Sequence, residues 1–235
     1  MTMSDEQPAK IKPTRVGRPR LGAEVGREAI LSKAIHAFGR QGFDGVNLRD
    51  LARQAGVNIA LANYHFGSKA ALWEACLDRM NLRAAPCIST LQAISAAPLA
   101  YPQRMADFYA AFIRFNADLP DYGLFILQEM VQEGPRQEQV KASLIDPFHD
   151  VTVPLLLEGM DLGLVHRQDA SLLFFTHSIT ISHVLAGQGT MAFFLQPEDR
   201  REQTLKDILA MIIRSAVGVL PDEFELAIAS ANPDA

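Results

Sequence analysis

The chain has 235 residues, of which 49% are hydrophobic and 21% are charged. This composition is too apolar for a disordered protein and too polar for one that spans a membrane several times. Two cysteines, Cys76 and Cys87, are too few for a disulfide scaffold or a four-cysteine zinc site, so we expect a reducing, cytoplasmic compartment. Residues 1–10 lack an apolar core and predict no signal peptide.

Two uncharged stretches, 84–103 and 170–197, are long enough to be considered as membrane spans. The first contains three prolines, which would interrupt a spanning helix repeatedly. The second holds His177 and His183 near its middle and fits a helix buried against protein better than one in lipid. We therefore expect a soluble protein with no membrane partner.

The net charge of −5 is divided unevenly along the chain. Residues 1–83 carry 13 Lys and Arg against 8 Asp and Glu, whereas residues 84–235 carry 9 against 19. A basic front on an acidic body suits an interaction with phosphate groups. Residues 1–22 combine basic side chains with Pro and Gly and predict a flexible basic arm, for which a solubilising tail is an equally good interpretation.

Helical spacing of apolar residues recurs along the chain, and the alternation typical of strands does not, which predicts an all-α protein. A helix is expected at 24–40, followed by a short one capped by Asn47 and a third at 59–65 capped by Asn58. The later helices are expected at 69–83, around 105–113, at 122–133, at 137–164 with bends at Pro147 and Pro154, at 169–186 and at 197–219. A short helical turn and frayed residues are expected after Pro221.

Two short helices near residues 48–55 and 59–65 meet across the turn Gly56-Val57-Asn58. Glycine permits the sharp angle at which the second helix projects outward. That is helix-turn-helix geometry, in which the projecting helix enters a DNA major groove. The turn alone is a weak signal, because many unrelated helix pairs share it.

The turn is preceded by the run from Gly42 to Ala52 and followed by Tyr64-His65-Phe66-Gly67-Ser68-Lys69. With these residues, the sequence resembles the head of the tetracycline-repressor (TetR) family over residues 24–73. The run from Asn58 to Lys69 also resembles a CecR-like subgroup. The resemblance implies a homodimer with a three-helix helix-turn-helix DNA-binding domain at 23–69, a larger helical-bundle domain for effector binding and dimerisation at 70–220, and a C-terminal tail at 221–235.

Side-chain chemistry within the head suggests direct contacts with DNA. Asn47 and Arg49 stand at the start of the first short helix, where backbone N–H groups and a guanidinium suit one phosphate. After Asn58 opens the second short helix, Asn63 suits adenine and either Ile59 or Ala60 suits a thymine methyl.

Three further head residues are assigned by the resemblance: Tyr64, His65 and Lys69 match family positions that contact the DNA backbone, whereas Phe66 is expected to face the core. Taken singly, each of the three also fits packing or solvation. The segment Gly17-Arg18-Pro19-Arg20 resembles an AT-hook core, so Arg18 and Arg20 are expected in an adjacent minor groove, with diffuse attraction to phosphate as the alternative.

Aromatic residues concentrate in the body and are expected to line an apolar cavity for a small effector. The candidate ligand-binding residues are Phe108, Tyr109, Phe112, Phe125, Phe148, His149, Phe174 and His177. Packing needs much of the same aromatic volume, and core histidines are the more usual interpretation of His149 and His177. The segments 169–186 and 197–219 are expected to form the dimer interface, although the first would also suit the bundle's central helix.

Enzyme signatures are absent from the sequence: the chain has no Gly-rich phosphate loop, no Cys-x-x-Cys and no His-Glu-x-x-His. No catalytic residue, cofactor or metal site is therefore expected. Buried cysteines are the usual case, and a thiol sensor at Cys76 or Cys87 is the alternative.

These features together predict a homodimeric, sequence-specific transcription regulator of the repressor type. A small apolar or aromatic effector would release it from a pseudo-palindromic double-stranded DNA operator. Two other classes are weighed beside it: a constitutive nucleoid-type DNA-binding protein without an effector, and an all-α small-molecule-binding protein or enzyme.

Overall fold

The computed structural model describes residues 21–187, 201–217 and 222–231, and these residues form helices and connecting turns without any strand. The helices are α1 (Leu21–Gly45), α2 (Leu48–Gln54), α3 (Ile59–Phe66), α4 (Lys69–Ser95), α5 (Tyr101–Asp118), α6 (Pro120–Met130), α7 (Pro135–Val140), a π-helical turn η1 (Lys141–Ile145), α8 (Asp146–Asp161), α9 (Ala170–Ala186), α11 (Arg201–Val217) and α12 (Asp222–Ser230). The predicted all-α fold is confirmed. No helix in the described part of the chain is both long and apolar enough to cross a membrane.

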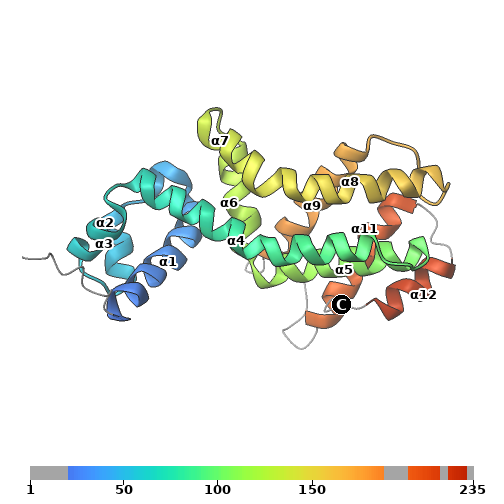
Figure 1. Cartoon of the computed structure of the whole chain (residues 1–235), viewed down its shortest axis with the longest axis horizontal. Helices are drawn as coiled ribbons and strands as arrows, with labels where there is room; N and C mark the ends of the chain where they lie inside the picture. The colour runs from blue at the N-terminus through green and yellow to red at the C-terminus, as the bar shows by residue number, and fades with distance from the viewer. Residues whose placement is uncertain (1–20, 188–200, 218–221, 232–235) are drawn as a thin grey trace, which may run out of the picture.

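The molecule is elongated, with a small head at one end and a larger helical body at the other (Figure 1). The head consists of α1, α2, α3 and the beginning of α4, which close around a small apolar core. Leu51 on α2, Ala62 and Phe66 on α3, and Leu72 on α4 are all buried there. Burial of Phe66 agrees with the expectation that it faces the core.

Helix α4 runs from the head into the body and is longer than the sequence predicted (Figure 1). The helix was expected to end near Arg83, but it continues through Pro86 to Ser95. The expectation was wrong because packing on both sides of the proline holds the helix together: Ala84 and Leu91 are completely buried, whereas Pro86 lies on the solvent side. The head and the body therefore share one continuous helix.

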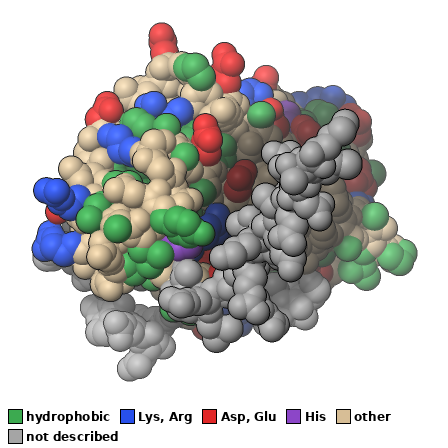
Figure 2. Space-filling view, turned by 60° about the vertical axis from the view of Figure 1, so that its left-hand side comes forward, with side chains coloured by type: hydrophobic (Ala, Val, Ile, Leu, Met, Phe, Trp, Pro, Cys, Tyr) green, Lys and Arg blue, Asp and Glu red, His purple; other side chains and the backbone are tan. Residues whose placement is uncertain are grey.

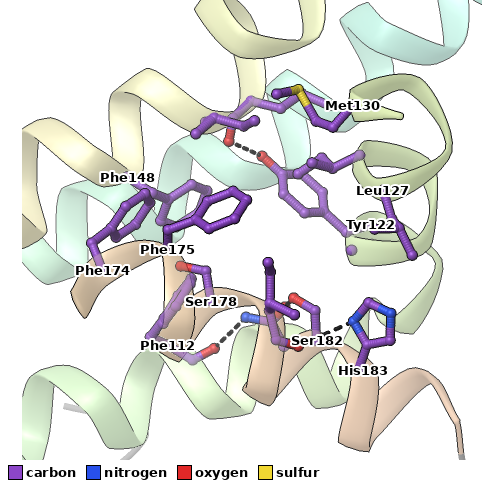
Figure 3. Close-up of a pocket in the computed structure, with 16 residues that line it drawn as sticks. Phe112, Tyr122, Leu127, Met130, Phe148, Phe174, Phe175, Ser178, Ser182 and His183 are labelled. Atoms are coloured by element: carbon purple, nitrogen blue, oxygen red, sulfur yellow. Dashed lines mark hydrogen bonds between the residues drawn. The ribbon is translucent and has the colours of Figure 1, made fainter. Parts of the chain in front are cut away.

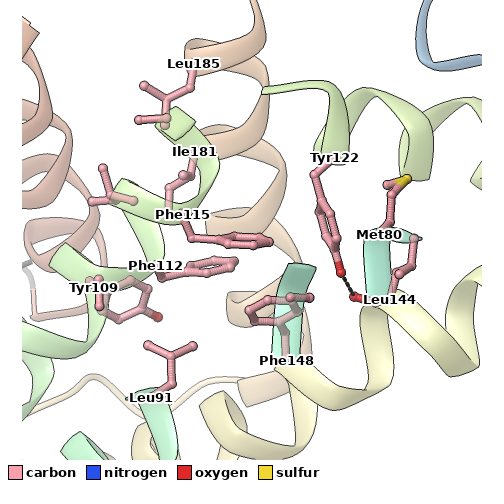
Figure 4. Packing of buried hydrophobic residues seen from close by; sticks show 14 of the residues in the cluster. Met80, Leu91, Tyr109, Phe112, Phe115, Tyr122, Leu144, Phe148, Ile181 and Leu185 are labelled. Carbon is pink, nitrogen blue, oxygen red and sulfur yellow. Dashed lines mark hydrogen bonds between the residues drawn. The ribbon is translucent and has the colours of Figure 1, made fainter. Parts of the chain in front are cut away.

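The core of the body contains a cluster of aromatic side chains (Figure 4). Phe115 of α5 lies with its ring centroid 4.9 Å from that of Tyr122 on α6, and Phe112 lies 5.2 Å from Phe148 on α8. Leu91 and Ile181 close the same cluster from α4 and α9 and have no exposed surface. This cluster joins helices that are distant in sequence.

The segment expected as one helix at 137–164 is divided into α7, η1 and α8. The π-helical turn ends just before Pro147, which stands in the first turn of α8, so the predicted helix is interrupted next to that proline. Pro154, by contrast, lies inside α8, and the helix is continuous across it. Pro154 is exposed, so its ring faces solvent rather than a packed neighbour.

The residues after Pro221 form a longer helix than the short helical turn expected from the sequence. They form the nine-residue helix α12, and Phe224 on this helix is completely buried. The ring of Phe224 meets that of Tyr101 at the start of α5 at 6.4 Å. This end of the chain therefore belongs to the packing of the body.

Candidate nucleic-acid interface and effector cavity

The turn between α2 and α3 has the geometry that projects a helix from the head. Gly56 adopts φ +68°, which L-residues rarely reach, and a side chain there would meet no atom within 4 Å. Its N–H donates to the carbonyl of Arg53, and the N–H of Val57 donates to that of Ala52. This pair of bonds is the Schellman arrangement that ends a helix at a glycine. The predicted helix-turn-helix is therefore present in detail.

Helix α3 begins at a side-chain cap and presents one polar face to solvent. The Oδ1 of Asn58 accepts a hydrogen bond from the Ala60 N–H at 2.8 Å. Ala60, Asn63 and Tyr64 are exposed, and their spacing of three and four residues puts them on one side of the helix. Tyr64 is 80% exposed, so an aromatic side chain stands free on this surface.

The start of α2 supplies a second polar group beside this face. The Oδ1 of Asn47 accepts from the Arg49 N–H at 2.8 Å, which confirms the predicted cap. Arg49 is exposed, and no ion pair joins it to any residue in the described part of the chain. A free guanidinium beside the N-terminal N–H groups of a helix is a suitable site for a phosphate.

Other predicted DNA-contact residues are partly used inside the head. Ile59 is half-buried against the core. His65 is also half-buried, and its Nε2 is buried with no hydrogen-bond partner in the described structure. The Nζ of Lys69 donates to the Phe43 carbonyl at 3.0 Å and lies 4.5 Å from the centre of the Phe43 ring. Lys69 thus ties the start of α4 to the end of α1, where helix carbonyls favour a positive charge.

The arm residues Arg18 and Arg20 lie outside the described residues, so their expected contact with the minor groove stays a prediction. Figure 2 turns the head end toward the viewer and shows Lys and Arg side chains at its outer edge, with acidic side chains elsewhere on the same view. Three arginines on α1, α2 and α4 are paired with carboxylates: Arg79 with Glu28 at 2.8 Å, Arg53 with Asp50 at 3.4 Å and Arg27 with Glu28 at 3.6 Å.

The body contains a cavity between α5, α6, the start of α8 and α9 (Figure 3). The cavity has a volume of about 630 Å³, which includes the part that opens to solvent. The lining is mostly apolar and aromatic. Its residues are Phe112, Asn116, Tyr122, Gly123, Ile126, Leu127, Met130, Leu144, Ile145, Phe148, Phe174, Phe175, Ser178, Ile179, Ser182 and His183.

Three of the predicted ligand-binding residues, Phe112, Phe148 and Phe174, line this cavity together. The other five lie elsewhere. Phe108 and Tyr109 have no exposed surface, Phe125 packs toward the head, His149 bonds to Ser171 at 3.0 Å, and His177 lies in the core beyond the cavity.

Residues that the sequence reasoning missed come chiefly from α6 and from the C-terminal half of α9, among them Leu127, Met130, Ser178 and Ser182. The sequence does contain a pattern for these residues, but the pattern does not show that they line a cavity. On each helix these residues recur at a spacing of three or four, which marks a face without saying what that face meets.

His177 belongs to a closed hydrogen-bond network that joins α5, α9 and α11. Its Nδ1 lies 2.7 Å from the Tyr109 hydroxyl and its Nε2 lies 2.8 Å from Ser215 Oγ, while Ser215 donates to the Ile212 carbonyl at 2.6 Å. Since Ser215 gives its proton to Ile212, His177 Nε2–H is the donor to Ser215 and Nδ1 accepts from Tyr109. Burial lowers the pKa of His177 to about 4 and raises the pKa of Tyr109 well above its usual value. This histidine is neutral and satisfied, so it does not activate Ser215.

Helix α6 separates the cavity from the head and contacts both. On its cavity side stand Leu127 and Met130. On the other side, the Phe125 ring stacks on Trp73 of α4 at 5.8 Å, and Glu129 accepts a hydrogen bond from Trp73 Nε1 at 2.9 Å. Glu129 is 2% exposed and also pairs with Arg136 at 3.0 Å.

The close packing of α6 on α1 is made possible by a glycine. A side chain at Gly39 of α1 would meet the Phe125 backbone nitrogen at 3.2 Å, so the two backbones nearly touch. The Arg136 guanidinium also lies 4.0 Å from the centre of the Phe43 ring at the end of α1. Helix α6 is therefore packed directly against both α1 and α4.

The cysteines are poor candidates for redox chemistry. Burial raises the pKa of the Cys76 thiol well above its usual value and that of the Cys87 thiol to about 12. Neither is a thiolate at neutral pH, which is the form that reacts. No group of three or more His, Cys, Asp or Glu side chains in the described residues could hold a metal ion.

Comparison with known families identifies the head. Residues 30–76 match the model for bacterial regulatory proteins of the tetR family. The transcriptional regulatory protein RaaS of Mycobacterium tuberculosis is 33% identical over 128 residues, which cover 52% of this chain. The matched stretch spans 60% of the length of RaaS.

Comparison with solved structures extends over most of the chain. A gamma-butyrolactone receptor (ArpA like protein) superimposes with a TM-score of 0.63 and 18% identity, covering 89% of this chain and 97% of the receptor. The TetR family transcriptional regulator PfmR from Thermus thermophilus superimposes with a TM-score of 0.53 and 21% identity, covering 80% of this chain and 95% of PfmR.

These structures share the fold, with a helix-turn-helix head followed by a helical domain. The matches do not distinguish the CecR-like subgroup, which stays a prediction. Because residues 30–76 match the family model and the α2–turn–α3 unit is intact, the head of this chain belongs to the tetR family of bacterial regulatory proteins.

Proposed function

We propose that this protein is a ligand-responsive transcriptional repressor that binds a specific DNA operator as a homodimer. The observation that carries the proposal is the exposed face of α3, on which Ala60, Asn63 and Tyr64 stand free beside the helix cap at Asn58. An asparagine amide can make two hydrogen bonds with adenine in the major groove, and a small methyl side chain can contact thymine. Arg49 would hold the adjoining phosphate.

The body supports the ligand-responsive part of the proposal through helix α6. This helix forms a wall of the cavity with Leu127 and Met130, and its opposite side packs on Trp73 and α1. An effector that fits the cavity only after α6 shifts would favour a second arrangement of the head. DNA and effector would then oppose each other, because each favours a different arrangement of the same packed helices.

The homodimer is supported by the outer face of α9. Leu172 is 64% exposed, and Phe175 and Ile179, which also line the cavity, continue the same side of the helix without any formal charge. An apolar stripe of this kind suits an interface between two copies. Two heads would then occupy successive major grooves about 34–36 Å apart. Leu172→Glu, which avoids the cavity lining, should convert the dimer to a monomer in size-exclusion chromatography with light scattering.

A titration by fluorescence anisotropy tests the proposed DNA binding. The purified protein is titrated into labelled DNA from the region upstream of its own gene and into a scrambled duplex of equal length, at about 150 mM salt. Tight binding to the upstream DNA alone supports the proposal. Equal binding to both, with a steep dependence on salt, supports a nucleoid-type protein instead, and no binding to any duplex in a genome-wide selection contradicts both.

A further inference from the structure

The cavity beside α6 offers very little to a charged ligand. None of the sixteen lining residues that the structure describes is Lys, Arg, Asp or Glu. His183 is the one lining side chain that can carry a positive charge, and it lies exposed, with Nδ1 3.2 Å from the Ile179 carbonyl. An ion that entered the apolar part would lose its hydration without gaining a partner of opposite charge.

Most of the polar atoms in the lining are already paired. Asn116 donates to the Phe112 carbonyl at 2.9 Å and accepts from Ser182 Oγ at 2.9 Å. The Tyr122 hydroxyl donates to the Leu144 carbonyl at 3.1 Å. These bonds fix the side chains, and they leave those groups with little capacity to recognise anything else.

Ser178 differs from these residues. Its hydroxyl oxygen is buried and has no hydrogen-bond partner in the described structure, although its residue lines the cavity. Figure 3 shows Ser178 on the α9 wall near Phe112, with Tyr122, Leu127 and Met130 on the opposite side. A buried hydroxyl left unpaired destabilises a protein, so a partner that enters the cavity would gain a hydrogen bond that the empty protein lacks.

We propose that the cavity takes an uncharged, mainly apolar molecule with one hydrogen-bonding group, and that this group pairs with the Ser178 hydroxyl. The inference rests on the proposed function, in which this cavity is the effector site. The aromatic walls formed by Phe112, Phe148 and Phe174 favour a ligand that carries a ring. The room for several water-sized molecules suits a ring with a short chain.

Three probes with the same ring and a four-carbon chain test separately the effect of a hydroxyl group and the effect of a charge on binding. They are butylbenzene, 4-phenyl-1-butanol and 4-phenylbutanoate. Their binding to the full chain is measured by isothermal titration calorimetry at neutral pH, without DNA. The alcohol should bind at least tenfold more tightly than the carboxylate, because the carboxylate has no cation to pair with inside the cavity. Ser178→Ala should weaken the alcohol roughly five- to tenfold and leave butylbenzene unchanged.

Ser89→Ala, at an exposed position of α4, is the matched control and should change none of the three affinities. Ser178→Ala should unfold at the same urea concentration as the parent or a higher one, since it removes an unpaired buried hydroxyl. The proposal is overturned if the carboxylate binds as well as the alcohol, if Ser178→Ala weakens all three probes equally, or if no probe binds up to its solubility.

The two proposals can fail separately. Probe binding as described in a protein that selects no DNA would overturn the repressor function and leave the ligand chemistry intact. Selective DNA binding with no response of the cavity to these probes would overturn the ligand chemistry alone.

Discussion

The head and the body of this protein carry their candidate functional groups in opposite ways. In the head, Asn63 and Tyr64 stand in solvent on α3, and the residues that hold the helix in place are different ones, such as Ala62 and Phe66. In the body, Phe112 and Phe148 line the cavity and also form the aromatic core. The candidate recognition residues Asn63 and Tyr64 are therefore separate from the packing of the head, whereas in the body the same side chains line the cavity and form the core.

The largest effect is expected in the body and depends on pH. Burial lowers the pKa of His177 to about 4, against an ordinary value of 6.5. Between these values the unfolded chain binds a proton that the folded chain excludes, so this contribution to stability is complete above pH 6.5 and is lost as the pH falls toward 4. The loss is roughly 3 kcal/mol.

Urea unfolding at about pH 7 and pH 4.5 measures this effect, with His177→Gln as the comparison. The variant keeps a donor and an acceptor for Ser215 and Tyr109 but does not titrate, so its pH dependence should be shallower by most of that amount. Identical pH profiles for both proteins would show that His177 is not held neutral.

A slightly smaller effect is expected on the exposed surface of the head. The double substitution Asn63→Ala and Tyr64→Ala should weaken operator binding on the order of a hundredfold, because each base or backbone contact contributes about 1–3 kcal/mol. The free energy of unfolding should change by less than about 0.5 kcal/mol, since both side chains are exposed.

Anisotropy titrations and urea unfolding of the same preparations test this separation. The control is Asn81→Ala, the same chemical change at an exposed position of α4, which should preserve both properties. A large loss of stability in the double variant would contradict the division between the two regions.

A substitution of Glu129, on the helix α6 that contacts both head and body, should change both the stability of the protein and its DNA binding. Glu129→Gln keeps an acceptor for Trp73 Nε1 but removes the charge that pairs with Arg136, which should destabilise the protein by about 2 kcal/mol. It should also alter the change in DNA affinity that an effector produces, because α6 carries both contacts.

Asp161→Asn is the control for this substitution, since Asp161 and Arg167 form an ion pair in which both side chains are 76% exposed. That variant should change stability by less than about 0.5 kcal/mol. Equal effects of the two substitutions on unfolding would argue against a special role for the buried carboxylate.

The smallest effect compares two turns of the same kind. Gly56 in the head and Gly163 in the body both have positive φ, +68° and +74°, and neither would place a side chain within 4 Å of another atom. Alanine at either position should destabilise the chain by about 1 kcal/mol through backbone strain alone. Only Gly56→Ala should also weaken DNA binding in the anisotropy titration, because only Gly56 sets the direction of α3.

Local features of the head could be predicted from short stretches of sequence. The caps at Asn47 and Asn58, the turn at Gly56 and the exposed positions of α3 were all predicted, because each depends on a few neighbouring residues. The all-α class and most helix positions followed from the spacing of apolar residues for the same reason.

The composition of the cavity and the long-range contacts could not be predicted in this way. The spacing of Phe108, Phe112 and Phe125 shows that they are buried, but only packing against distant helices assigns Phe112 to the cavity and the other two to solid core. The hydrogen bond between Glu129 and Trp73 joins residues 56 positions apart, and no local sequence pattern predicts it. Contacts with other helices likewise determine that Lys69 bonds to the Phe43 carbonyl and that α4 continues past Pro86. The free energy of a buried side chain depends on the partners that the fold brings to it, and these are distant in sequence.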